Sequence, residues 1–88
     1  SQILMDTMPS EEFVLKVTGY ALAVDGVLAV NSLILRPRGS IYLGDISIAV
    51  NPDLTVTEGH EIAHLVEKQL QAHEHSLGGV MVHVEPHS

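Results

Sequence analysis

The sequence predicts a small α+β domain, a two-layer sandwich in which two helices cover one face of a three-stranded sheet. Apolar residues recur at helical spacing in residues 11–24 and again in residues 55–73. Residues 28–36 are rich in Leu, Ile and Val, and residues 41–50 and 80–85 alternate between apolar and polar side chains. The expected order is therefore helix, strand, strand, helix, strand, within one domain of 88 residues.

The first helix is expected to follow a lead-in, residues 1–9, that lies outside the core. Ser10 has the side chain of an N-cap, and Glu11 and Glu12 follow in the first turn, where the helix dipole favours anions. The Asp25-Gly26 pair predicts the end of the helix. Its apolar face is formed by Phe13, Val14, Val17, Tyr20, Ala21 and Val24.

The two strands that come next predict an antiparallel hairpin. Residues 36–40, Arg-Pro-Arg-Gly-Ser, supply the turn between them. Along residues 41–50 the side chains divide between two faces of the sheet. One face carries Ile46, Ile48 and Val50, and the other carries Asp45, Ser47 and Ala49.

The second helix has the clearest start signal in the chain. Thr55 and Glu58 have the spacing of a capping box, and the helix is expected to run to about His73. Its predicted buried stripe consists of Ile62, Leu65, Val66 and Leu70. A turn at Gly78-Gly79 is expected to lead into the last strand, which Pro86 ends. In that strand Val80, Val82 and Val84 alternate with Met81, His83 and Glu85.

The composition excludes several classes of function. Four Lys and Arg residues against 11 Asp and Glu residues give a formal net charge of −7, so nucleic-acid binding and docking to an anionic membrane surface are not expected. No apolar segment approaches the roughly 20 residues of a membrane-spanning helix. The chain has no cysteine, which excludes disulfides and thiolate ligands. It has six histidines, all at or after His60.

The most conspicuous motif is His60-Glu61-Ile62-Ala63-His64, which matches the HExxH pattern of zinc peptidases. Histidines four apart lie on one helix face and can reach a single metal ion. However, at 100° per residue His60 and His64 point away from the predicted buried stripe. A peptidase needs these histidines at the floor of a cleft, so we expect them instead on a polar helix surface, where they are available to metal.

A second candidate site lies on the last strand. His83 and Glu85 are two residues apart, so both project from the face opposite Val82 and Val84. An imidazole and a carboxylate on one face can serve as ligands of a divalent cation. The spacing alone favours an ordinary polar strand face. If His60 meets His83 and Glu85 in the folded chain, however, the three would form a metal site.

The chain resembles the cytoplasmic C-terminal domain of cation diffusion facilitator transporters over roughly residues 3–86. The resemblance is carried by Val24-Asp25-Gly26-Val27, by residues 50–63 (VNPDLTVTEGHEIA) and by the closing Val82-His83-Val84-Glu85-Pro86, together with Leu4-Met5-Asp6, Leu35-Arg36, Gly39 and Val66-Glu67. It implies a metallochaperone-like, ferredoxin-like fold and a cytosolic location next to a membrane domain. Residues 1–9 would then lead in from the last transmembrane helix, residues 10–86 would form the regulatory domain, and residues 87–88 would be a tail.

The same resemblance implies a V-shaped homodimer that closes on divalent metal and promotes export of the ion. A heterodimer with a related transporter is a further implied partner. His60, His83 and Glu85 correspond to metal ligands of the family, and His64 is expected to add a surface ligand. Asn31 and Ser47 stand where zinc exporters of the family carry histidines, so the site would be mononuclear, shared across the dimer or weak.

Imidazole and carboxylate ligands suit zinc first by affinity, and also iron, manganese, cobalt or nickel. A divalent ion would offset repulsion between two acidic chains, and protonation of histidine near pH 6.5 would weaken its binding. Three alternatives remain: a dimerisation module that binds no metal, a stand-alone metallochaperone or metal buffer, and an HExxH metallopeptidase. The regulatory-domain interpretation implies no enzymatic activity.

Overall fold

The computed structural model describes residues 9–88 and confirms the predicted order of elements. Helix α2 (Glu11–Leu22) is followed by strands β1 (Ala29–Arg38) and β2 (Ile41–Val50), helix α3 (Val56–His73) and strand β3 (Leu77–Pro86). Apart from Pro9, the expected lead-in lies outside the described residues. Within residues 9–88, no helix is both long enough and apolar enough to span a membrane.

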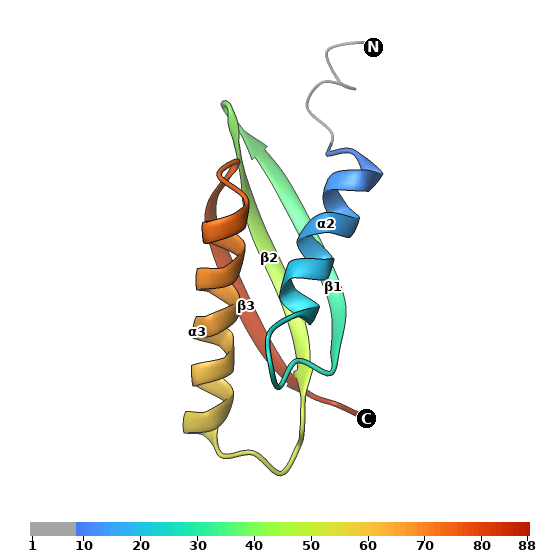
Figure 1. Ribbon diagram of the computed structural model, residues 1–88, viewed down its shortest axis with the longest axis vertical. Helices are drawn as coiled ribbons and strands as arrows, with labels where there is room; N and C mark the ends of the chain where they lie inside the picture. The colour runs from blue at the N-terminus through green and yellow to red at the C-terminus, as the bar shows by residue number, and fades with distance from the viewer. Residues whose placement is uncertain (1–8) are drawn as a thin grey trace.

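The three strands form one sheet in the order β1-β2-β3, and both helices lie on the same face of it (Figure 1). Strands β1 and β2 are antiparallel, as the hairpin prediction requires, whereas β2 and β3 are parallel. The parallel pairing depends on α3, which carries the chain back along the sheet between them. The resulting domain is elongated, with extents of 47 × 23 × 17 Å.

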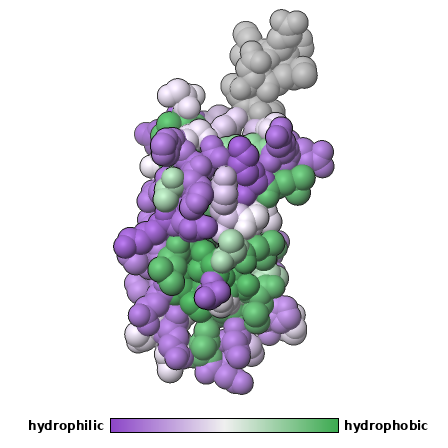
Figure 2. Space-filling model, in the orientation of Figure 1, coloured by the Kyte–Doolittle hydropathy of each residue, from purple (hydrophilic) through white to green (hydrophobic). Residues whose placement is uncertain are grey.

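The core lies between the helices and the sheet, and β2 supplies its centre. Alternate residues of β2 point toward the helices, as predicted, and Val66 and Leu70 of α3 and Val17 and Ala21 of α2 are completely buried against them. The largest fully buried side chains are Ile46, Ile48, Leu70, Val17 and Val66. Apolar surface also remains exposed on the helix-covered side (Figure 2).

Helix α3 begins as the sequence predicts. The Thr55 side chain accepts a hydrogen bond from the Glu58 amide, and the Glu58 carboxylate accepts one from the Thr55 amide, which completes the capping box. The predicted buried stripe is wrong at one position: Leu65 is 52% exposed. Leu65 lines a surface hollow together with His60, Glu61 and His64, so it belongs to the solvent-facing side of α3 and not to its buried stripe.

Three predicted boundaries differ from the structure. Helix α2 ends at Leu22, two residues early, and the chain then turns through Gly26, whose φ of +97° suits glycine. Strand β1 extends through Pro37 to Arg38, because Gly39 at φ +61° lets Gly39 and Ser40 alone close the hairpin.

The predicted turn at Gly78-Gly79 is wrong, because both glycines belong to β3. The turn instead falls at residues 75–76, directly after α3. Gly78 packs closely against Ile41, where a Cβ atom would lie 2.0 Å from the Ile41 Cδ1 atom. The glycine therefore permits close packing of β3 rather than a change of chain direction.

Candidate metal site

The face of the sheet opposite α2 and α3, called the open face here, collects side chains from all three strands. Parallel pairing places Ser47 beside His83 and Ala49 beside Glu85, so His83 and Glu85 share this face, as predicted. Residues of β1 and β2 whose side chains point in the same direction as His83 and Glu85 complete the open face. The open face consists of Asn31, Ser32, Ile34, Arg36, Leu43, Asp45, Ser47, Ala49, Met81, His83 and Glu85.

Asp45 lies at the centre of the polar residues on the open face. Its Oδ1 atom is 4.0 Å from Nε2 of His83 on β3, and its Oδ2 atom accepts a 2.7 Å hydrogen bond from Nη1 of Arg36 on β1. The Asp45 side chain is 28% exposed and that of His83 is 53% exposed, so a solute can reach both. A carboxylate and an imidazole at this separation can become ligands of one divalent cation after small side-chain movements.

A second polar contact lies further along the same face. The Nδ2 atom of Asn31 donates a 2.8 Å hydrogen bond to Oε1 of Glu85, across the central strand. Asn31 occupies the irregular position in the β1–β2 pairing between Val30 and Ser32. The Glu85 carboxylate is thus held by the amide of Asn31, the residue that stands where a histidine ligand would be expected.

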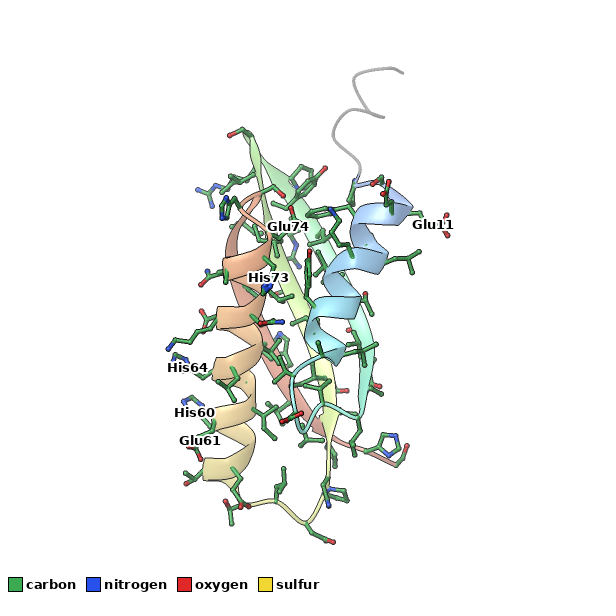
Figure 3. All side chains as sticks on the ribbon, viewed as in Figure 1. Glu11, His60, Glu61, His64, His73 and Glu74 are labelled. Atoms are coloured by element: carbon green, nitrogen blue, oxygen red, sulfur yellow. The ribbon has the colours of Figure 1, made fainter. Side chains whose placement is uncertain are left out.

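His60 shares a cavity with Glu85, and His83 does not line that cavity. Figure 3 shows His60 and His64 pointing outward from α3, away from α2, as the helical spacing predicts. His60 and Glu85 both line a cavity of about 370 Å³ where β2 ends and α3 begins. The other lining residues are largely apolar: Val50, Asn51, Pro52, Leu54, Thr55, Val56, Gly59, Val84 and Pro86.

His64 stands on the exposed surface of α3. Its Nδ1 atom is 3.9 Å from Oε1 of Glu67, one turn along the helix. Together with His60, Glu61 and Leu65 it lines a surface hollow. No group of three or more His, Cys, Asp or Glu side chains within residues 9–88 is already arranged to enclose a metal ion. The assignment of His60, His64, His83 and Glu85 as ligands therefore stays a prediction.

Asp45 is the site residue that the sequence analysis missed as a ligand. The alternation of β2 placed it on the polar face together with Ser47, which was the available signal. What the sequence could not supply is the parallel register between β2 and β3. That register pairs His83 with Ser47, which is two residues after Asp45 on β2 and points to the same face. It therefore determines that the side chains of Asp45 and His83 meet.

Comparison with known proteins gives a consistent family. Residues 9–87 match the family described as cation efflux protein, cytoplasmic domain (ZT_dimer). Over 63 residues the chain is 40% identical to the uncharacterized transporter YdbO and 33% identical to the manganese efflux system protein MneS, both of Bacillus subtilis. Each match covers 72% of this chain and 21% of the relative, so the chain spans about a fifth of their length.

Solved structures show the same fold. The nickel form of a MamM C-terminal domain variant superimposes with a TM-score of 0.87 at 25% identity, covering 90% of this chain and 100% of that one. A cadmium form gives a TM-score of 0.86 at 26% identity over 89% of this chain and 98% of that one. The matched family consists of transporter domains and is not an enzyme family, so it lends no support to the metallopeptidase alternative.

Proposed function

Because the chain belongs to the family of cytoplasmic domains of cation efflux proteins, we propose that it is the regulatory domain of a divalent-cation exporter. In this proposal a divalent metal ion binds between two copies of the domain and draws them together, which promotes efflux by the membrane part. The observation that carries the proposal is the 4.0 Å approach of Asp45 and His83 on the face of the sheet opposite α2 and α3.

The number of ligands supports a site shared by two copies. Asp45 and His83 give two donor atoms per chain, whereas zinc prefers four ligands and manganese about six. Two open faces that meet supply two aspartates and two histidines to one ion. Ile34 and Met81 pair with Asp45 from either side and are 51% and 60% exposed, so a second copy would also cover apolar surface. The family name itself refers to dimerisation.

The donor atoms limit the choice of metal. Carboxylate oxygen and imidazole nitrogen suit manganese, iron, cobalt, nickel and zinc, and the chain offers no thiolate. Affinity alone favours zinc over manganese. One relative is described as a manganese efflux protein, and MamM domain structures have been solved in manganese, cadmium and nickel forms. We propose manganese as the transported ion and any of these metals as the bound regulator.

Charge provides the driving force for closure. Each chain carries a formal net charge of −7, so two copies repel each other when their acidic surfaces approach. A doubly charged cation between the open faces offsets part of this repulsion. It shifts the equilibrium toward the closed dimer only to the extent that it binds that form more tightly than the open one.

His60 and Glu85 form a second ligand pair in this proposal. Both line the cavity at the end of the domain, so an ion there would lie apart from the Asp45–His83 pair. His64 would be a weaker surface ligand beside Glu67.

The proposal also concerns the rest of the transporter. Residues 10–86 form the domain, and residues 1–9 connect it to the membrane helices of the longer protein, whose relatives are about five times the length of the matched segment. The same face that pairs two identical chains would allow a heterodimer with a related transporter.

A metal-independent dimerisation module is the alternative that the geometry also favours. Both carboxylates of the open face already accept hydrogen bonds, Asp45 from Arg36 and Glu85 from Asn31. Both contacts occupy a carboxylate oxygen atom, and the Arg36 guanidinium also offsets the negative charge of Asp45. Under this alternative two copies would associate equally well with and without metal.

Metal titration with a distance measurement tests the proposal. Since the chain has no cysteine, a single Ser40→Cys substitution in the exposed β1–β2 turn accepts one spin label per copy. Manganese is replaced by diamagnetic zinc for the distance measurement. We expect zinc to shorten the distance between labels. Asp45→Asn combined with His83→Ala should abolish the shortening and reduce calorimetric uptake to what the His60–Glu85 pair retains.

His75→Ala is the matched control, because His75 is an exposed histidine outside the open face. It should behave as the unsubstituted chain does. If the double variant takes up zinc as well as the control does, the Asp45–His83 site is refuted. An unchanged distance at saturating metal would instead favour the metal-independent module.

A further inference from the structure

Arg36 is placed to affect any ion bound by Asp45. It lies on β1, paired with Leu43, which is two residues before Asp45 on β2. Its guanidinium donates to Asp45 through the 2.7 Å contact described above, and its own side chain is 63% exposed. The open face therefore contains a fixed positive charge in direct contact with the candidate metal ligand.

The two oxygen atoms of Asp45 have different neighbours. Oδ2 receives the guanidinium of Arg36, whereas Oδ1 faces Nε2 of His83. A metal ion bound by Oδ1 and Nε2 would thus share the carboxylate with Arg36 instead of having to displace it. The cost to the ion is electrostatic, because a second positive charge lies on the same carboxylate.

We propose that Arg36 sets the metal affinity of the Asp45–His83 site: it orients the Asp45 carboxylate and opposes the incoming cation, so that the domain responds only when the ion is abundant. This inference rests on the proposed function. With neutral histidine, Asp45 and Arg36 bring the formal charge of the site to zero in each copy. A regulator of an exporter needs such a threshold, since binding at trace concentration would keep it permanently closed.

Arg36 has the opposite effect on a dimer without metal. When two open faces approach, their Asp45 carboxylates repel each other, and each guanidinium compensates one of these charges. Removing Arg36 should therefore tighten metal binding and at the same time weaken association of the metal-free chains. A residue that only stabilises the sheet would change neither quantity in this paired way.

The experiment compares Arg36→Gln, Arg36→Lys and a control, Arg38→Gln, by calorimetry with manganese chloride and by sedimentation without metal. Arg38 lies two residues after Arg36 on β1 and makes no ion pair within residues 9–88. Arg38→Gln therefore changes the net charge by the same amount as Arg36→Gln but breaks no contact with Asp45. We expect Arg36→Gln to bind manganese about tenfold more tightly at low salt and Arg36→Lys to resemble the unsubstituted chain. Metal-free dimerisation of Arg36→Gln should weaken several-fold.

The possible outcomes are distinguishable. If Arg36→Gln binds manganese no more tightly than Arg38→Gln, while Asp45→Asn still lowers uptake, the role of Arg36 is wrong and the proposed function stands. If Asp45→Asn leaves uptake unchanged, both proposals fail. A gain in affinity shared equally by Arg36→Gln and Arg38→Gln would reduce the effect to net charge and overturn the specific role of Arg36.

Discussion

Asn31 and Glu85 join the two outer strands of the sheet through a 2.8 Å hydrogen bond that passes over the central strand. Ala49 is the residue of β2 that pairs with Glu85, and its small side chain leaves space for the two longer ones to meet. Asn31 reaches this point because it lies at the irregularity between Val30 and Ser32. A local deviation in β1 therefore positions a neutral amide against a candidate metal ligand.

Replacing Asn31 by histidine should strengthen metal binding. An imidazole beside Glu85 is a better ligand for transition metals than an amide oxygen, and it would leave the carboxylate free to bind the ion. We expect Asn31→His to lower the zinc dissociation constant by about tenfold in calorimetry. Asn31→Ala removes the same hydrogen bond without adding a ligand, and equal affinities of the two variants would contradict a metal site at Glu85.

Metal uptake should weaken as the pH falls. An imidazole binds metal only when it is neutral, and free histidine gains its proton near pH 6.5. Between pH 7.5 and pH 5.5 the apparent affinity is therefore expected to fall, because protons compete with the metal ion for each imidazole that binds it. Calorimetry in buffers of different ionisation enthalpy would also detect the released protons.

His75→Ala again serves as the control and should retain the full pH dependence. Uptake that is equal at both pH values would mean that carboxylates alone hold the ion, which is incompatible with a role for His83.

Two glycines should respond in opposite directions to replacement by alanine. Gly26 has φ +97°, and a Cβ atom there would lie 2.6 Å from Cδ1 of Ile62, so Gly26→Ala should destabilise the domain by about 1–3 kcal/mol. Gly19 lies within α2, and apart from its neighbours and the backbone of its own helix no atom of residues 9–88 lies within 4 Å of an added Cβ. Gly19→Ala should stabilise it by about 0.5–1 kcal/mol. Urea denaturation measures both, and a destabilised Gly19→Ala would show that this surface is covered.

Two leucines of α3 should differ in their contribution to stability. Leu70 is completely buried, and Leu70→Ala should cost about 2–5 kcal/mol through lost contacts and the remaining cavity. Leu65 is 52% exposed, so Leu65→Ala should cost less than about 1 kcal/mol. Thermal unfolding at low protein concentration compares the two while the chains are dissociated. Equal losses would mean that Leu65 is packed as the helical spacing alone suggests.

Local signals account for most of the fold that could be predicted. The capping box at Thr55 fixed the start of α3, and the alternation along β2 and β3 assigned each side chain to the correct face. The errors arose where packing between elements decides. Leu65 has the spacing of a buried residue but lies beside Glu61 and His64 on the exposed side of α3. Gly78 resembles a turn residue although it lies in a strand that packs closely against Ile41.

The candidate site was less accessible to sequence reasoning than the fold. His83 and Glu85 could be placed on one face because they are two residues apart on a strand. Asp45 and Arg36 are separated from His83 by 38 and 47 positions in the numbering, so only the order and register of the strands bring the three together. Register depends on the whole sheet and its crossover helix, and no short window of sequence contains that information.

The elongated shape of the domain affects how far a small rearrangement can reach. The chain enters α2 near one end of the 47 Å axis, while the C-terminal end of β3 and the cavity lined by His60 lie toward the other (Figure 1). A rigid-body tilt of about 10° about the β3 end would swing the start of α2 through about 8 Å. The long shape of the domain would thus amplify a sub-ångström shift of the metal ligands into a displacement of the start of α2 that is comparable to the width of a helix.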